Sequence, residues 1–332
     1  VEQGSVLVET AWSCISIGTE MSGIREGSKP LIQRAIEQPE QVMKTAKMAI
    51  EQGVGRTFSV VKGVLESGYP MGYSAAGTVV QAGEGINDIQ TGDRVACAGT
   101  GIANHAEIIN VPRNLLVRIP DNLELREAST VTLGAIALQG IRRANPTIGE
   151  TFFVTGLGIL GQMTAQMLRA NGCRVIGFDP DNVRVALAKS LGMGFGISYD
   201  EDAITKVMQL TDGHGADGVI ITAATPSDEV ISQAFQSCRK KGRVVLVGDV
   251  GLNLKRSDFY IKEIDFLIST SYGPGRYEPG YEKKGLDYPI GYVRWTENRN
   301  MQEYLRLLSE GLIDIKPLIQ KEYGLDEAPS AY

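Results

Sequence analysis

Six consecutive residues, Gly156-Leu157-Gly158-Ile159-Leu160-Gly161, have the glycine spacing that is typical of a diphosphate-binding turn. The run follows the apolar stretch Thr151–Thr155, which predicts a strand, and it opens a stretch with helical periodicity. In this context the first glycine permits a tight turn, the second lets the backbone approach a diphosphate, and the third lets helix and strand pack closely. Unpaired N–H groups at the start of the helix attract an anion. We therefore predict that these residues bind the diphosphate of a dinucleotide.

A carboxylate stands at the end of the next predicted strand. Asp179 follows the glycine run at about the 20-residue spacing of the acid that binds the adenosine ribose hydroxyls. Such a carboxylate repels a 2′-phosphate, and Pro180 follows it where an arginine would favour NADP. The sequence therefore favours NAD over NADP, although Arg184, a turn further on, would suit NADP. The alternative is that the glycines only shape a turn and that Asp179 caps the next helix.

The nicotinamide half of the cofactor is expected at the ends of the later strands. Ligands of a doubly wound sheet bind outside the carboxyl ends of its strands. The residues expected there are Ala223, Ala224, Val247, Gly248 and Ser271.

A second group of motifs lies between residues 72 and 95. The segments 72–80, 83–85 and 91–95 read GYSAAGTVV, GEG and TGDRV. They resemble the G-H-E-x-x-G-x-V and G-D-R-V signature of medium-chain dehydrogenases. The resemblance implies a GroES-like β-rich catalytic domain beside a Rossmann domain.

A narrower resemblance rests on a helical insertion at Lys29–Gly68 and on the segments 271–277 and 288–297. These are similar to the bi-domain oxidoreductases, in which a medium-chain dehydrogenase unit is commonly fused to a second oxidoreductase unit of the glucose-fructose oxidoreductase type. A looser resemblance is to the bacteriochlorophyllide hydroxyethyl dehydrogenases. The likeness implies that the chain is part of a longer polypeptide with a fused oxidoreductase unit.

The motifs that hold zinc in this superfamily are altered. Where zinc enzymes have a C-x-T-D run and a G-H-E run, this chain has Ile17-Gly18-Thr19-Glu20 and Gly72-Tyr73-Ser74. Isoleucine and tyrosine cannot replace a thiolate and an imidazole on zinc. Cys14 lies three residues early, and no four-cysteine lobe follows Val95. The sequence therefore predicts no catalytic zinc.

A metal-free site needs a side chain that moves the substrate proton. By the resemblance, Thr19 matches the hydroxyl that relays this proton. Tyr73 is the preferred acid/base or alkoxide donor, the alternative being a ring that fills the vacated volume. Glu20 and His105 are further catalytic candidates. For Glu20 the alternative is an ion pair with an arginine, and for His105 a structural role.

Aromatic and arginine side chains are concentrated between residues 272 and 299. They suit sugars, carboxylates or phosphates. The alternative is a loop that packs on a second subunit, since interfaces favour the same residue types. The predicted substrate-binding residues are Tyr272, Arg276, Tyr292, Arg294 and Trp295.

The elements that position these residues predict an α/β chain. Period-two alternation over Ser5–Ser13 and short apolar runs between Gly72 and Pro120 indicate antiparallel strands. Beyond Leu123, strand and helix patterns alternate, which predicts a doubly wound parallel sheet of six strands. We predict a GroES-like domain over residues 1–122 and 296–332, and a Rossmann domain over 123–295 whose loop 272–295 reaches the cleft. The insertion at 29–68 reads as core or subunit contact, or as a lid.

Composition narrows the classes of partner. The 332 residues are 43% hydrophobic and 22% charged with a formal charge of -6, so no basic face is expected for nucleic acid. No apolar run is long enough to cross a membrane. We expect a cytoplasmic protein with a small-molecule substrate, assembled as a homodimer or a higher homo-oligomer.

These observations predict a zinc-independent, NAD-linked dehydrogenase or reductase that acts on a small polar substrate such as a sugar derivative. With a fused partner, it would oxidise its substrate transiently and return the same hydride. A second hypothesis is an NADPH-dependent quinone or enoyl reductase. A third is a non-catalytic scaffold that binds a dinucleotide.

Overall fold

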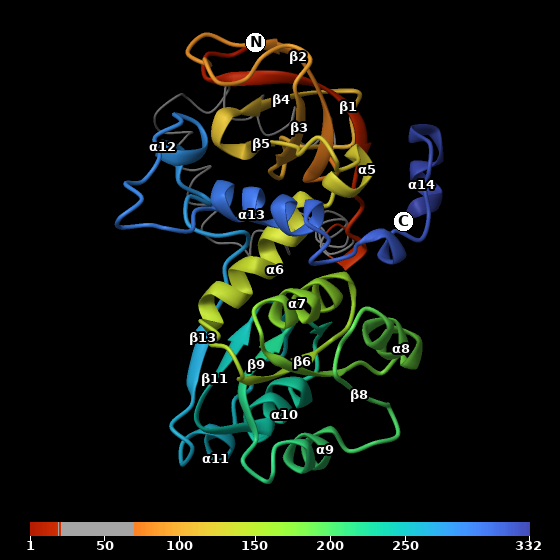
Figure 1. The fold of residues 1–332 in the computed structure, drawn as a ribbon, viewed down its shortest axis with the longest axis vertical. Coiled ribbons are helices and arrows are strands. Elements are labelled where there is room, and N and C mark those ends of the chain that lie inside the picture. The colour runs from red at the N-terminus through yellow and green to blue at the C-terminus, as the bar shows by residue number, and fades with distance from the viewer. Residues whose placement is uncertain (19, 21–69) are drawn as a thin grey trace, which may run out of the picture.

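The computed structural model describes residues 1–18, 20 and 70–332 (Figure 1). Two large sheets form the two ends of the molecule, and two helices, α6 (Val131–Ala144) and α13 (Glu297–Ser309), lie between them. The predictions for Thr19 and for the Lys29–Gly68 insertion fall outside the described residues.

An antiparallel sheet of five strands, in the order β4-β1-β2-β3-β5, forms the GroES-like end. The predicted strand Ser5–Ser13 is confirmed as β1, which turns Val6 and Val8 into the core. β1 pairs with β2 on one side and with β4 on the other, antiparallel in both cases. The other strands are β2 (Ser74–Ala82), β3 (Arg94–Ala98), β4 (Ile108–Pro112) and β5 (Leu116–Arg118), with the 3-10 turn η1 (Arg113–Leu115) and the short helix α5 (Leu125–Ala128) beside them.

The other end is the predicted six-stranded parallel sheet, in the order β13-β11-β9-β6-β7-β8. Its strands are β6 (Thr151–Thr155), β7 (Arg174–Phe178), β8 (Phe195–Ile197), β9 (Ala216–Ile221), β11 (Cys238–Leu246) and β13 (Asp265–Ile268). The helices that cover it are α7 (Ile159–Ala170), α8 (Asn182–Ser190), α9 (Ala203–Leu210), α10 (Glu229–Ser237) and α11 (Arg256–Phe259). The predicted α/β fold class, a doubly wound sheet beside a GroES-like sheet, is therefore confirmed.

Two differences from the predicted elements concern helices. α10 ends at Ser237 rather than near Lys241, because the buried Cys238 pairs with Ala216 and already belongs to β11. α6 was not predicted. Eleven of its 14 residues are buried.

The buried helix α6 joins the two ends of the molecule. A Cβ added at Gly134 would lie 2.2 Å from the Tyr304 ring of α13, and one added at Gly140 would lie 2.5 Å from Val247 at the end of β11. The Tyr304 hydroxyl is 2.7 Å from the Thr130 hydroxyl. These close approaches fix the position of the parallel sheet relative to α13.

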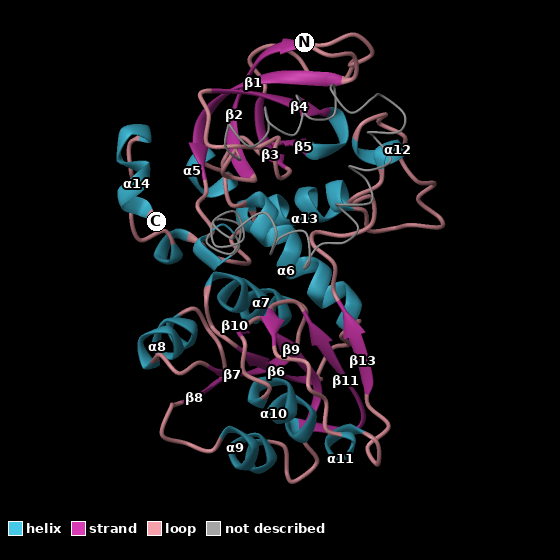
Figure 2. Ribbon diagram, turned by 180° about the vertical axis from the view of Figure 1, so that it is seen from behind, coloured by secondary structure: helices cyan, strands magenta, loops and turns pink. Residues whose placement is uncertain are grey.

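The chain ends beside the space between the two sheets. η2 (Lys316–Leu318), η3 (Leu325–Glu327) and α14 (Ala328–Ala331) form this last segment, on the opposite side of α13 from α12 (Pro279–Glu282), as Figure 2 shows from behind. In the described part of the chain, no helix is both long and apolar enough to cross a membrane.

Candidate functional site

The three glycines of the turn differ in the space around them. Gly156 has a φ of +90°, and a Cβ there would lie 2.6 Å from the Ala223 nitrogen. A Cβ at Gly161 would lie 1.9 Å from the Gly156 carbonyl oxygen. A Cβ at Gly158, by contrast, would meet nothing within 4 Å. The outer glycines are thus required by the protein itself, whereas the middle one leaves open space in front of the N-terminus of α7.

Asp179 connects this turn to the end of β7. Its carboxylate is buried, and it accepts hydrogen bonds from the Leu157 N–H at 2.7 Å and the Asp181 N–H at 2.9 Å. Arg184 lies 3.6 Å from both the Asp179 and the Asp181 carboxylates. Two carboxylates therefore surround one guanidinium, with Pro180 between them.

The residues expected near the nicotinamide follow the neighbouring strands. A Cβ at Gly248, after β11, would lie 2.0 Å from the Ala223 oxygen, after β9. Ala224, in the short strand β10 (Ala224–Thr225), pairs with Asp249 in β12 (Asp249–Val250). Ser271 follows β13 with a φ of +49°. The carboxyl ends of the strands thus lie along one edge, as the topology requires.

Sequence reasoning missed Thr222. Its hydroxyl donates to the Thr155 carbonyl at 3.2 Å and also to the Gly156 carbonyl. It therefore ties β9 to the first glycine of the turn. The only signal in the sequence was a hydroxyl residue between the apolar strand β9 and Ala223.

A cavity of about 330 Å³ lies beside the glycine turn. Ile159, the first residue of α7, lines it. The end of β1, His105 and the chain between Arg126 and Thr130 line the other sides. Residues 318–325 and Tyr332 cover it from the C-terminal segment. The cavity therefore joins the dinucleotide turn to the GroES-like sheet.

Two of the predicted catalytic residues, Glu20 and His105, are in contact beside this cavity, and His105 lines it. His105 Nε2 is 3.0 Å from Glu20 Oε2, and His105 Nδ1 is 2.8 Å from the Ser13 hydroxyl. Glu20 therefore pairs with a histidine rather than with an arginine. Ser13, Glu20 and His105 form what we call the Ser13–His105–Glu20 relay. Ser13 was not predicted, because nothing in the sequence places it near His105.

Hydrogen bonds hold the Glu20 carboxylate in its ionised form. Burial by itself would raise its pKa, but bonds from His105, the Ser16 N–H and the Tyr332 hydroxyl lower the pKa below its usual value. An ionised Glu20 requires the proton of the neutral imidazole on Nε2. Nδ1 then faces the Ser13 hydroxyl as an acceptor.

Tyr73 directly precedes β2 in the sequence. Its side chain is buried, and its carbonyl accepts bonds from the Thr132 hydroxyl and the Gly99 N–H, both at 3.0 Å. The preceding Gly72 has a φ of +94°, and a Cβ there would lie 2.8 Å from the His105 nitrogen. The backbone that precedes Tyr73 therefore packs closely against His105.

The donor set in the cavity does not favour a metal. Burial, and then Glu20, raise the pKa of the Cys14 thiol to about 12, so Cys14 stays protonated. Among residues 1–18, 20 and 70–332, no three His, Cys, Asp or Glu side chains are grouped as a metal site needs. The absence of catalytic zinc remains a prediction.

The five predicted substrate-binding residues do not share one surface. Tyr272 is 2% exposed, whereas Tyr292 is 91% exposed. Arg276 forms an ion pair with Glu282 at 2.5 Å. Arg294 and Trp295 line a second cavity, between α12 and α13.

Glu297, at the start of α13, is a buried acid that sequence reasoning missed. Neither of its carboxylate oxygens has a hydrogen-bond partner among the described residues. Burial, and then the charge of Glu282, raise its pKa to about 9, while Arg276 lowers it. Glu297 is therefore protonated in the folded protein at neutral pH.

Replacing Glu297 by glutamine is expected to stabilise the protein at alkaline pH. Above its ordinary pKa of about 4.5, Glu297 ionises in the unfolded chain but not in the folded one, so the wild type loses stability as the pH rises toward 9. One pKa unit corresponds to about 1.4 kcal/mol, so E297Q should gain on the order of a few kcal/mol. Urea unfolding at pH 5 and pH 8 measures this. A stability difference that stays constant between the two pH values, as expected for the exposed control E84Q, would refute the burial argument.

Comparisons with known proteins agree with this geometry. The profile of a family described as zinc-binding dehydrogenase matches residues 160–283. Sorbitol dehydrogenase of Halalkalibacterium halodurans is 26% identical over 298 residues, which cover 79% of this chain and 78% of that protein. D-guloside 3-dehydrogenase of Escherichia coli K12 is 27% identical over 280 residues, which cover 82% of this chain and 75% of that protein.

Several solved structures share the fold. Alcohol dehydrogenase TADH from Thermus sp. ATN1 has a TM-score of 0.72 at 20% identity, covering 100% of this chain and 89% of that one. A protein from Sinorhizobium meliloti 1021 that is described as a zinc-binding dehydrogenase was solved bound to NADP. It has a TM-score of 0.71 at 19% identity, covering 99% of this chain and 87% of that one. The GroES-like sheet, the Rossmann sheet and these relatives together support the resemblance to the medium-chain dehydrogenase/reductase superfamily.

Proposed function

We propose that this protein is a zinc-independent, NAD(H)-dependent oxidoreductase that transfers hydride to or from a small polyhydroxylated substrate. The observation that carries the proposal is the cavity that joins Ile159, at the dinucleotide turn, to the Ser13–His105–Glu20 relay. The names of two relatives, sorbitol dehydrogenase and D-guloside 3-dehydrogenase, support a sugar or polyol as the substrate.

The chain's residues fit the cofactor in two places. Backbone N–H groups at the start of α7 face the open space at Gly158 and would bind the diphosphate. Asp179 would accept the ribose hydroxyls. When bound, the nicotinamide ring accepts or donates the hydride.

In alcohol oxidation the relay would remove the hydroxyl proton. The Ser13 hydroxyl would accept this proton from the substrate while its own proton passes to His105 Nδ1. The ionised Glu20 would stabilise the resulting imidazolium through Nε2. In carbonyl reduction the same protons would move in the opposite direction. Thr19 and Tyr73, both by the family resemblance, remain further proposed proton carriers.

A kinetic comparison of the two reduced cofactors tests this proposal. With a panel of sugars, polyols and their carbonyl forms, we expect kcat/KM with NADH to exceed that with NADPH by about tenfold or more, because Asp179 repels a 2′-phosphate. The activity should survive dialysis against a chelator. A preference for NADPH, or activity that returns only with added zinc, would contradict the proposal.

An NADPH-dependent quinone or enoyl reductase is the second candidate. Arg184, which is half exposed beside Asp179, is the observation that favours it, since an arginine here can accommodate a 2′-phosphate. The NADP-bound Sinorhizobium structure and a quinone oxidoreductase structure from Pseudomonas syringae share the fold. NADH binding without hydride exchange to any substrate would instead support a non-catalytic scaffold. The domain boundaries, the homo-oligomer, the fused unit and the cytoplasmic location also remain predictions.

A further inference from the structure

A larger cavity, of about 680 Å³, lies away from the dinucleotide turn. It is formed by η1, α12, α13 as far as Arg306 and the chain between Asp287 and Thr296. It shares none of its described lining residues with the cavity at Ile159. Figures 1 and 2 place α12 and the C-terminal segment on opposite sides of α13. Its volume is within the range of small-molecule sites.

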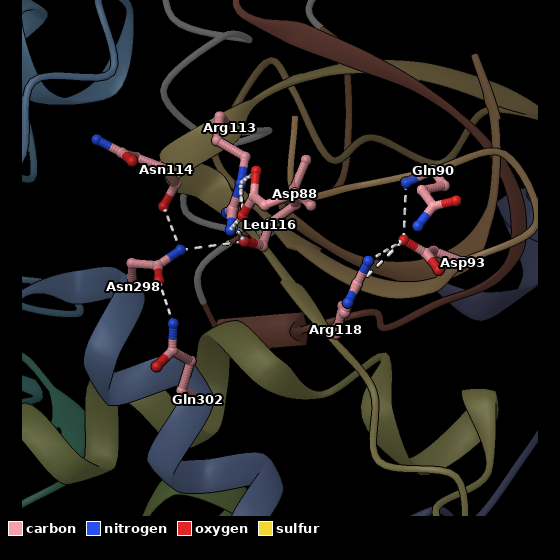
Figure 3. Close-up of polar contacts among 9 residues, drawn as sticks. All are labelled: Asp88, Gln90, Asp93, Arg113, Asn114, Leu116, Arg118, Asn298 and Gln302. Carbon is pink, nitrogen blue, oxygen red and sulfur yellow. Dashed lines mark hydrogen bonds and ion pairs between the residues drawn. The ribbon is translucent and has the colours of Figure 1, made fainter. Parts of the chain in front are cut away.

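Amide side chains hold the wall of this cavity in place (Figure 3). Asn298 Nδ2 donates to the carbonyl oxygens of Asn114 at 2.8 Å and Leu116 at 3.0 Å, and Gln302 Nε2 donates to Asn298 Oδ1 at 2.7 Å. Asn114 Nδ2 in turn donates to the Tyr281 carbonyl at 2.9 Å. The polar wall is therefore formed before any ligand binds.

Three of the arginines that line the cavity already have carboxylate partners. Arg113 Nε lies 3.0 Å from both oxygens of Asp88, as Figure 3 shows. Arg299 pairs with Asp287, and Arg306 pairs with Glu303. These pairs leave acceptor lone pairs on the carboxylates, which suit the hydroxyl groups of a polyol.

Arg294 is the exception. Within the described ranges it has no carboxylate partner, and its guanidinium stacks on the Trp295 ring at 3.9 Å. Arg142 stacks on the same ring at 3.5 Å, and its Nε is buried without an acceptor in the described chain. Burial, and the charge of Arg294, lower the pKa of Arg142, whereas Glu303 raises it. Positive charge therefore exceeds negative charge around Trp295.

We propose that this cavity is a second binding site for a small anionic polyol, such as a sugar acid or a sugar phosphate. Arg294, held by Trp295, pairs with the anionic group, and the carboxylates of the wall accept hydrogen bonds from the hydroxyls. The proposed site does not depend on the proposed function, because the two cavities have no described lining residue in common.

Calorimetric titration of the full chain with four probes tests this site. The probes are glucuronate, glucose 6-phosphate, neutral glucose and inorganic phosphate. We expect saturable binding of glucuronate, glucose 6-phosphate or both. The neutral sugar and the free phosphate should bind at least about tenfold more weakly, since each lacks one of the two recognised features.

Two matched variants locate the binding. R294Q should weaken the binding of the sugar anion by about ten- to one-hundred-fold, the range expected for loss of one charge-assisted contact. R306Q removes the same charge from the same cavity, but its arginine already bonds Glu303 and Glu310, so the affinity should change less than about threefold. NADH affinity and the circular dichroism spectrum should be unchanged in both.

Several results would overturn the proposal. These are the absence of binding by both sugar anions, glucose or phosphate binding as tightly as they do, and equal losses in R294Q and R306Q. Because NADH binding is measured separately on the same samples, failure of this site is distinguishable from failure of the proposed function.

Discussion

Replacing Gly156 by alanine is expected to weaken NADH binding by at least about one-hundred-fold. Gly156 has a φ of +90°, which costs an L-residue about 1–2 kcal/mol. An alanine Cβ would also lie 2.6 Å from the Ala223 nitrogen, and backbone atoms cannot move away as a flexible side chain can. The turn would open, and the N–H groups at the start of α7 would no longer point toward the diphosphate. Fluorescence titration with NADH measures the loss.

Gly149 provides a matched control for this variant. It has almost the same φ, +89°, but a Cβ there would meet nothing within 4 Å. G149A should therefore have a similar unfavourable backbone conformation, which lowers the melting temperature. It should still bind NADH as the wild type does. If G156A also bound NADH with wild-type affinity, the turn would not be the diphosphate site.

Replacing His105 by glutamine is expected to lower turnover by about 10²- to 10⁴-fold, the usual contribution of a general acid or base. Glutamine retains hydrogen-bonding atoms for Glu20 and Ser13, but it cannot accept a proton. NADH affinity should change little, because His105 lies in the GroES-like half. Steady-state kinetics with NADH and a reducible substrate give kcat, and binding titrations give the affinity.

Two further readouts separate a catalytic His105 from a structural one. The limb of the kcat–pH profile that reports the base should disappear in H105Q, which a merely structural role would not cause. Y73F is the competing variant, because Tyr73 was the acid/base favoured by the sequence. A large loss of turnover in Y73F together with a nearly normal H105Q would transfer the role to Tyr73.

Local patterns predicted the parts of the fold that depend on local sequence. The glycine run, the strand before it and Asp179 are close in the chain, and the structure joins them through the Leu157 N–H. Alternation over Ser5–Ser13 likewise gave the bounds of β1. These features follow from backbone sterics and side-chain period, so one segment suffices to predict them.

The relay could not be predicted in the same way. Glu20 and His105 are 85 residues apart, and Ser13 and His105 are 92 apart. Their contacts exist only after β1 and the chain beyond β3 have packed together. The prediction for the 272–295 segment failed for a different reason. It assigned residues that are close in sequence to one substrate-binding surface. The buried Tyr272 and the exposed Tyr292 lie in different environments.

The most direct test of the account is a calorimetric titration of the wild-type protein with NADH. The account predicts saturable binding at one site per chain, since the open space at Gly158 and the acceptor at Asp179 belong to a single turn. A binding enthalpy can be zero at one temperature, so the titration is repeated at a second temperature. An absence of NADH binding at both temperatures would contradict the account.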